Sequence, residues 1–253
     1  MSDFERFSSI VEQANFDKGI PNQLLMRESG NLSTYYAPFD YVNLEARIVI
    51  CGITPGLKQA MLALREAKSQ LAAGATLEVA WRKAKETASF GGPMRINLIR
   101  MLDHIGIQKY LGIGSASDLF SEASNLVHYT SALRYPVFLS GMNYNGTPKM
   151  TIHPDLRWQL EEHLSQELGS LPNTVVVPLG PKVEEALDYL ARRGKLSRDR
   201  VLAGMPHPSG TNAERIAYFL EQKPRAELSS KTNPEKIEHA RTALLERVAR
   251  LGI

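Results

Sequence analysis

The sequence predicts an α/β protein, a three-layer sandwich in which helices flank a central four-stranded parallel sheet. Four segments are short, apolar and bounded by turn residues, which is typical of buried parallel strands. Helical patterns separate these segments, and strands that alternate with helices favour right-handed crossovers and a parallel sheet. The predicted strands are Arg47–Cys51, Leu126–Ser131, Thr174–Leu179 and Arg200–Ala203.

Helix signals fill the intervals between these strands. A helical insertion is expected at about 57–88, interrupted near Gly74 and restarted by Thr76 as an N-cap. Proline suits the first turn of a helix. Further helices are therefore expected to begin at Pro93, Pro154, Pro181 and Pro234, and the C-terminal one covers about 234–251.

The bulk composition bounds the class of protein. A chain of 253 residues with 43% hydrophobic and 23% charged residues suits one large domain, expected over residues 1–253. No apolar run is long enough to span a membrane, and Met1–Arg6 lacks the pattern of a secretory signal, so a cytoplasmic location is expected. Cys51 is the only cysteine, which excludes an internal disulfide. The formal net charge of +3 permits a nucleic-acid partner without arguing for one.

The first predicted strand runs directly into Gly52-Ile53-Thr54-Pro55-Gly56, which we call the first loop. Ligands of open parallel sheets usually bind at the carboxyl ends of the strands. Glycines let the backbone approach a ligand closely, and the N–H groups at a following helix start can hold an anion or a carbonyl oxygen. A plain strand-to-helix turn is the alternative interpretation.

The last predicted strand leads into His207-Pro208-Ser209-Gly210, which we call the second loop. Prolines on both sides hold His207 rigidly, so its ring can donate a hydrogen bond to a developing anion without reorganising. Thr211 to Glu214 then fit a capping box before an apolar helix face. Helix capping is the alternative role for the serine and threonine residues here.

Taken together and in this order, the two loops resemble the two motifs of the uracil-DNA glycosylase superfamily. The first family motif has a Gly-x-x-Pro-Gly form in the mismatch-specific and single-strand-selective branches, and the second is typically His-Pro-Ser followed by a small residue or proline. The resemblance covers roughly residues 35–220. It implies a monofunctional DNA glycosylase that removes uracil, or a related deaminated base, in base excision repair.

The resemblance also assigns the residues around the base. Phe90 matches the aromatic residue that stacks on the extruded base, with core packing as the alternative. Thr130, with Ser131 beside it, stands where members often carry an asparagine that reads the pyrimidine edge. A hydroxyl makes fewer bonds than an amide, so broader or different base selectivity is expected. Thr54 stands where well-known branches carry Asp or Asn, and its hydroxyl cannot act as a general base near neutral pH.

In the implied mechanism, the damaged base leaves the DNA stack and enters a pocket between the two loops. His207 donates to the base oxygen as negative charge develops, Thr54 orients the water, and the backbone N–H groups near Ile53 assist. DNA is the implied partner and free uracil the product, no metal or organic cofactor is implied, and a monomer is expected. The residues implied to contact DNA are Gly52, Pro55, Gly56, Pro208, Ser209, Gly210, Asn212 and Arg215.

Three other functions stay open. The chain could bind a nucleobase or DNA without cutting it, because Thr54 and Thr130 both depart from the family pattern. It could remove hypoxanthine or xanthine, or it could hydrolyse free nucleosides or nucleotides.

Several further residues are candidates for the same site. Asp40 and Asp155 are potential stand-ins for the missing acid, although surface charge is the favoured explanation of both. Tyr35–Phe39 either borders the pocket or packs under the sheet. The basic face of the insertion is expected to be solvated, with DNA contact as the alternative. Its residues are Arg82, Lys83 and Lys85.

Overall fold

Residues 3–89 and 93–251 are described by the computed structural model, and they divide into two units. The first unit consists of Met1–Val42, Gly52–Ser89 and Tyr129–Ser170. The second unit consists of Asn43–Cys51, Phe90–His128 and Leu171–Ile253. Each unit combines segments that are distant in sequence, so no single composition shift along the chain marks its limits.

Three of the predicted parallel strands form as expected, which confirms the α/β class. They are β3 (Ile48–Gly52), β4 (Val127–Ser131) and β7 (Val175–Pro178), in the sheet order β4-β3-β7. β3 pairs with β7 in parallel, with Ile48 opposite Val175. Every residue of β3 and β7 is buried, as in parallel strands covered on both faces.

The prediction of a fourth parallel strand at Arg200–Ala203 is wrong. Only Val201 pairs, in an isolated parallel bridge with Val176. The chain then turns away at Gly204, which has φ +113° and donates its N–H to the Glu184 carboxylate at 2.7 Å. A positive φ is accessible to glycine and breaks the extended backbone that a strand needs. The parallel sheet therefore consists of three strands and one bridge.

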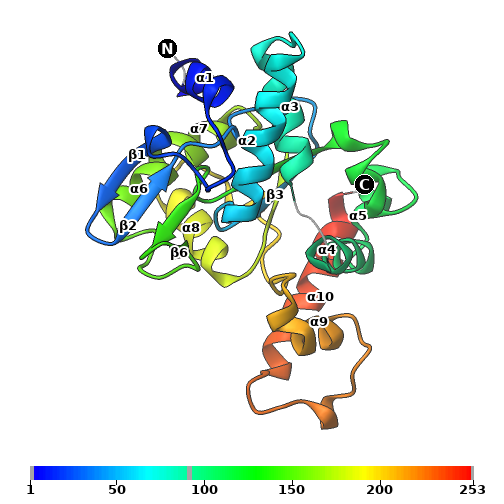
Figure 1. The fold of residues 1–253 in the computed structure, drawn as a ribbon. Coiled ribbons are helices and arrows are strands. Elements are labelled where there is room, and N and C mark those ends of the chain that lie inside the picture. The colour runs from blue at the N-terminus through cyan, green and yellow to red at the C-terminus, as the bar shows by residue number, and fades with distance from the viewer. Residues whose placement is uncertain (1–2, 90–92, 252–253) are drawn as a thin grey trace. The chain divides into compact units, whose positions relative to one another are not determined.

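A second, antiparallel sheet lies in the first unit and was not predicted. Its strands are β1 (Leu25–Ser29), β2 (Leu32–Tyr35), β5 (Val137–Leu139) and β6 (Met142–Asn143), in sequential order across the sheet (Figure 1). β2 pairs with β5, with Leu32 opposite Leu139. Ser140 and Gly141 form the tight turn between β5 and β6, both with positive φ. These strands span two to five residues, too few for alternation to predict them.

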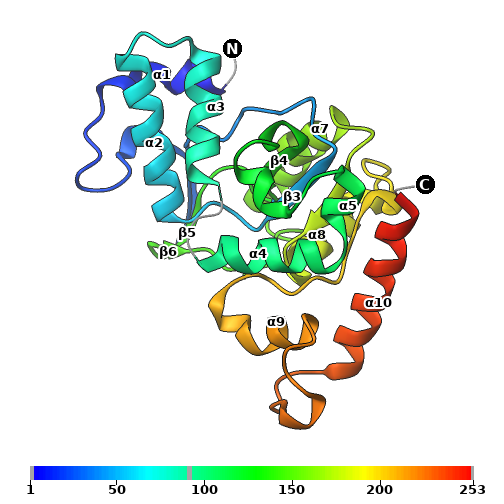
Figure 2. The same ribbon diagram turned by 90° about the vertical axis from the view of Figure 1, so that its right-hand side faces the viewer.

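The helical insertion of the first unit is confirmed as two helices. They are α2 (Leu57–Ala72) and α3 (Leu77–Ala88), which lie side by side in Figure 2. Gly74 separates them with φ +80°, and the Thr76 side chain accepts from the Val79 N–H at 3.4 Å. Two further helical stretches follow β6, namely α6 (Pro154–Gln159) and α7 (Ser165–Gly169), joined by the π-helical turn Leu160–Leu164.

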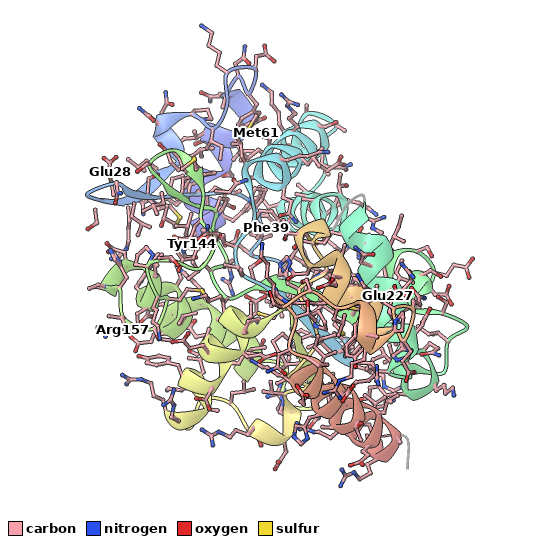
Figure 3. The ribbon with its side chains drawn as sticks, turned by 90° about the horizontal axis from the view of Figure 1, so that it is seen from below. Glu28, Phe39, Met61, Tyr144, Arg157 and Glu227 are labelled. Carbon is pink, nitrogen blue, oxygen red and sulfur yellow. The ribbon has the colours of Figure 1, made fainter. Side chains whose placement is uncertain are left out.

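The core of the first unit is aromatic. The helix α1 (Asp3–Gln13) contributes Phe4, Phe7 and Val11, which recur at helical spacing and are buried. Phe39 and Met61 belong to the same core, and both are labelled in Figure 3. Of the two alternatives for the Tyr35–Phe39 segment, packing in the interior holds for most of it, since Tyr36, Ala37 and Phe39 are buried.

The second unit carries the remaining helices, and the predicted helix starts at Pro93, Pro181 and Pro234 are confirmed. They are α4 (Pro93–His104), α5 (Ile107–Leu111), α8 (Pro181–Arg192), α9 (Ala213–Phe219) and α10 (Pro234–Leu251) (Figure 2). Short 3-10 turns occupy Asn22–Leu24, Ala116–Phe120, Ser124–Leu126, Arg198–Arg200, Gly210–Asn212 and Arg225–Glu227. Within residues 3–89 and 93–251, no helix has the length and apolar character needed to cross a membrane.

The predicted capping box at Thr211–Glu214 is wrong. A 3-10 turn precedes α9, so the N-cap is Asn212, and no side-chain hydrogen bond caps the helix there. The third helical position is then Arg215 rather than Glu214, which removes the geometry of a capping box. Glu214 instead accepts from the hydroxyls of Ser229 and Thr232 in the polar segment that precedes α10.

Candidate functional site

The first loop follows β3 and pairs with the segment after β4. The carbonyl of Gly52 accepts from the Ala132 N–H at 2.8 Å, and the carbonyl of Ile53 accepts from the Leu133 N–H at 2.9 Å. Pro55 is buried, whereas Ile53 is half-buried. Backbone pairing and proline together fix the path of this loop at the carboxyl end of its strand.

Thr54 is held by backbone on both sides of its hydroxyl. Its Oγ1 donates to the carbonyl of Tyr135 at 3.0 Å and accepts from the N–H of Val137 at 3.2 Å. A hydroxyl has one proton and two lone pairs. The single proton is therefore committed to the fold, and one lone pair is left to accept from another donor.

The first N–H groups of α2 already have acceptors. Gly56 donates its N–H to Oε1 of Gln59 at 3.1 Å, and Leu57 donates to Oδ1 of Asn143 at 2.8 Å. A Cβ added to Gly56 would lie 3.3 Å from Nδ2 of Asn143, so glycine permits this close approach. The expectation that this helix start offers free N–H groups to an anion is thus not met at these two positions. Asn143 comes from β6, and no signal in the sequence linked it to the first loop.

His207 of the second loop has a defined protonation pattern. Its Nδ1 accepts from the N–H of Ser209 at 3.2 Å. A neutral imidazole that accepts at Nδ1 carries its proton on Nε2. Burial lowers the pKa of His207 below its ordinary value of 6.5, so the ring is neutral at pH 7. Among the described residues no partner is found for Nε2, and His207 is half-buried.

Close packing determines where His207 lies. Gly180, the N-cap of α8, has φ +90°, and a Cβ added there would lie 3.1 Å from Cβ of His207. Asn97 of α4 donates its side-chain amide to the carbonyl of Pro208 at 3.0 Å. The second loop is therefore fixed by two other segments of its own unit.

The predicted DNA-contacting side chains of the second loop and α9 form a chain of hydrogen bonds. Asn212 donates to Oγ of Ser209 at 3.1 Å, and Arg215 donates to Oδ1 of Asn212 at 2.8 Å. Arg215 also donates to the carbonyl of Lys231 at 3.0 Å. Arg215 and Gly210 are exposed, and Ser209 and Asn212 are half-buried.

The two predicted base-reading residues on β4 differ in their surroundings. Thr130 is 7% exposed, and its Oγ1 is a buried oxygen without a hydrogen-bond partner in the part of the chain that the structure describes. Such an atom is costly unless a ligand or water satisfies it. Ser131 is half-buried. Phe90, the predicted stacking residue, lies outside the described residues.

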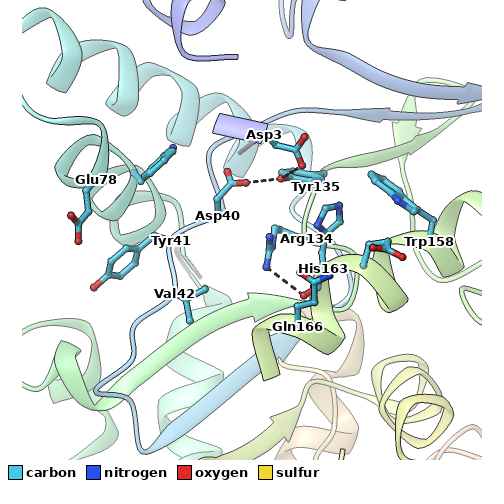
Figure 4. A pocket seen from close by; sticks show the side chains of 12 residues that line it. Asp3, Asp40, Tyr41, Val42, Glu78, Arg134, Tyr135, Trp158, His163 and Gln166 are labelled. Carbon is cyan, nitrogen blue, oxygen red and sulfur yellow. Dashed lines mark hydrogen bonds between the residues drawn. The ribbon is translucent and has the colours of Figure 1, made fainter. Parts of the chain in front are cut away.

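A pocket of about 640 Å³ lies in the first unit, and none of the predicted site residues that the structure describes lines it (Figure 4). Asp40 lies in its wall, with its carboxylate bonded to the hydroxyls of Tyr135 at 2.5 Å and Tyr36 at 3.0 Å. Burial raises the pKa of Asp40, against the opposing effect of Arg134. The interpretation of Asp40 as surface charge is therefore wrong. Asp155 forms an ion pair with Arg27 at 3.2 Å.

Arg134, which lines this pocket, belongs to a group of buried charges with Glu167 and Lys85. Arg134 donates to Oε2 of Glu167 at 2.6 Å, and Lys85 lies 3.4 Å from Oε1 of the same carboxylate. Burial lowers the pKa of Lys85, whereas for Arg134 the carboxylates of Glu167 and Asp40 outweigh burial and raise the pKa. The prediction of a solvated basic face is thus wrong for Lys85, which is 5% exposed.

The pocket also contains a neutral histidine. Burial and the nearby Arg134 lower the pKa of His163 to about 4. Its Nε2 and the Nε1 of Trp81 are buried and have no hydrogen-bond partner within residues 3–89 and 93–251. In that same part of the chain, no group of three or more His, Cys, Asp or Glu side chains is placed to hold a metal ion.

Comparison with known proteins gives a relative whose function is not described. The chain is similar to the uncharacterized protein YoxB of Bacillus subtilis, with 38% identity over 205 residues that cover 80% of this chain and 80% of YoxB. No protein-family model and no solved structure matches the chain.

Proposed function

The chain belongs to the family of YoxB, and we propose that it is a monofunctional DNA glycosylase of base excision repair. The proposed reaction is hydrolysis of the N-glycosidic bond of uracil, or of a related deaminated base, in DNA. The proposal includes the three-layer sandwich of the uracil-DNA glycosylase superfamily and a site in which both loops serve one flipped base.

The state of His207 is the observation that carries this proposal. Cleavage of the glycosidic bond leaves negative charge on the departing base, and a donor aimed at the base oxygen stabilises that charge. His207 is neutral, has its proton on Nε2 and keeps that proton available for a ligand. The N–H of Ser209 fixes the tautomer, so no reorganisation is needed during the reaction.

The remaining roles follow from what each side chain has left to offer. Thr54 has a spare lone pair, so it accepts a hydrogen bond from the attacking water and leaves the water oxygen directed at the sugar. Thr130 offers an unpartnered hydroxyl that bonds the base edge, with Ser131 beside it. Backbone near Ile53 assists, and Phe90 stacks on the base. The chain of Ser209, Asn212 and Arg215 contacts the DNA backbone.

The test is release of uracil from defined DNA. Purified protein is incubated with single-stranded and double-stranded oligonucleotides that carry one uracil, and alkali-sensitive abasic sites are counted. We expect strand cleavage after alkali only with the uracil-containing strand. Parallel substrates with hypoxanthine and xanthine establish the preferred base, and free deoxyuridine tests hydrolysis without DNA. Absence of abasic sites with all three bases would overturn the proposal.

A second function, binding without cleavage, is supported by the hydrogen bond that the Thr54 hydroxyl donates to the fold. Because its only proton is donated to the Tyr135 carbonyl and no acid replaces it in the first loop, the chain would bind a damaged base without cutting. Tight binding of uracil-containing DNA, measured by fluorescence anisotropy and accompanied by no base release, would establish this alternative.

A further inference from the structure

The pocket of the first unit carries negative charge that the protein does not neutralise. Among the residues that the structure describes, no cation forms an ion pair with three of its carboxylates, those of Asp3, Glu78 and Glu162. Asp40, the fourth, is bonded to the hydroxyls of Tyr36 and Tyr135, and the Tyr135 hydroxyl also lies 3.0 Å from Oδ2 of Asp3. Carboxylates that face one cavity without a cationic partner repel each other, and a bound cation would relieve the repulsion.

The cationic group in the wall is already in use. Arg134 is bonded to Glu167 through Nε at 3.0 Å and through Nη2 at 2.6 Å. His163 is neutral at pH 7, because burial lowers its pKa to about 4. Its buried Nε2 has no partner among the described residues. The wall therefore offers acceptors and negative charge.

Aromatic faces complete the wall. Tyr41, Trp81 and Trp158 line the pocket together with Tyr135. Figure 4 shows the Asp40 carboxylate between Tyr41 on one side and Tyr135 on the other. Carboxylates beside aromatic faces are the combination that holds flat organic cations.

The chain itself uses this combination next to the pocket. The guanidinium of Arg27 lies 4.0 Å from the ring centroid of Trp158 and forms an ion pair with Asp155 at 3.2 Å. One wall residue thus already holds a guanidinium between its ring and a carboxylate. The pocket repeats these groups around an open cavity of about 640 Å³, which suits a small molecule.

We propose that this pocket binds a small organic cation with a guanidinium or amidinium head. The head bonds Asp40 and Asp3 and packs against Trp81, while Glu78 and Glu162 attract it at the mouth. No residue of either loop lines the pocket, so this site is separate from the proposed glycosylase site and does not depend on it.

The first test compares two ligands that differ in charge. Butylguanidinium and N-butylurea have nearly the same shape, and only the first is a cation. We expect isothermal titration calorimetry of the full chain to give at least about tenfold tighter binding of butylguanidinium, the factor of about 1.4 kcal/mol. Equal binding of the two, or no binding of butylguanidinium at millimolar concentration, would overturn the proposal.

The second test uses residues whose loss leaves the fold intact. Glu78 and Glu162 are exposed, so Glu78→Gln and Glu162→Gln keep their shape and remove one charge each. Each change should weaken butylguanidinium binding about two- to fivefold, the range of an exposed ion pair. Glu246→Gln on α10 is the matched control and should leave the affinity unchanged. If the double variant Glu78→Gln/Glu162→Gln binds as tightly as the parent chain, the site is not electrostatic and the proposal fails.

Discussion

The two loops have similar lengths and similar glycine and proline content, but they use their polar groups differently. In the first loop, the Thr54 hydroxyl and the N–H groups of Gly56 and Leu57 are all bonded within the first unit. In the second loop, Nδ1 of His207 accepts a hydrogen bond from the N–H of Ser209, and Nε2–H has no partner among the described residues. The difference is that the first loop has most of its polar groups bonded within the fold, whereas the second keeps one donor free for the role proposed above.

The largest expected effect is the loss of that donor. We expect His207→Ala to lower the single-turnover rate of uracil release about 10²- to 10³-fold, the usual worth of one oxyanion donor. His239→Ala removes an exposed imidazole on α10 and should leave the rate unchanged. If His207→Ala keeps full activity, the contrast between the loops has no catalytic meaning.

Thr54 tests the first loop's side of the contrast. Thr54→Val keeps the shape and leaves the Tyr135 carbonyl and the Val137 N–H without their partner. Urea denaturation should show a fall of about 1–3 kcal/mol in the free energy of unfolding. Thr54→Ser retains the hydroxyl and should unfold like the parent chain. An unchanged unfolding free energy of Thr54→Val would show that the hydroxyl does not stabilise the fold, and would leave positioning of the attacking water as its only proposed role.

Asn143 of β6 tests whether the bonded N–H groups after the first loop stabilise α2. Asn143→Ala removes the acceptor of the Leu57 N–H, and loss of a helix N-cap costs about 0.5–2 kcal/mol. Asn143→Asp keeps Oδ1 and should retain the stability. Thermal unfolding of the two variants measures the difference, and equal melting temperatures would show that α2 does not depend on this cap.

The smallest expected effect is the response to pH. Because the folded pKa of His207 lies below 6.5, its ring is mainly neutral from pH 8 to 7 and the rate of base release should be flat over that range. As the pH falls through the lowered pKa, protonation of Nδ1 breaks the bond from Ser209, and both the rate and the stability contributed by this histidine are lost. A pH–rate profile that falls between pH 8 and 7 would contradict this assignment.

Local signals predicted the elements, whereas the pairings came from distant residues. Continuous apolar runs predicted β3 and β7, and prolines predicted the starts of α6 and α8, because these depend on neighbours in sequence. The burial of Asp40 depends on Tyr135, which lies 95 positions away. The cap of Leu57 comes from Asn143, 86 positions away. Such contacts exist only once the fold has formed, so residue spacing could not predict them.

Lys85 illustrates the same limit from the charged side. It follows Arg82 and Lys83, and the three charges read as one solvated face. Arg82 and Lys83 are indeed exposed enough to pair with Glu86, at 3.7 and 3.0 Å. Lys85 points to the interior because Glu167 and the Tyr41 carbonyl receive its ammonium group. Only the partner, and not the charge pattern, decides which lysine is buried.

The position of the His207 imidazole also depends on Gly180, a residue that lies outside both loops. A single methyl group at this position would meet Cβ of His207 at 3.1 Å, and its φ of +90° already disfavours other residues. Transplanting His207–Gly210 alone into another scaffold would therefore transfer the hydrogen-bond donor without the space at Gly180 that accommodates it. A search for distant relatives should therefore require both a glycine at the position of Gly180, directly before α8, and a histidine at the position of His207.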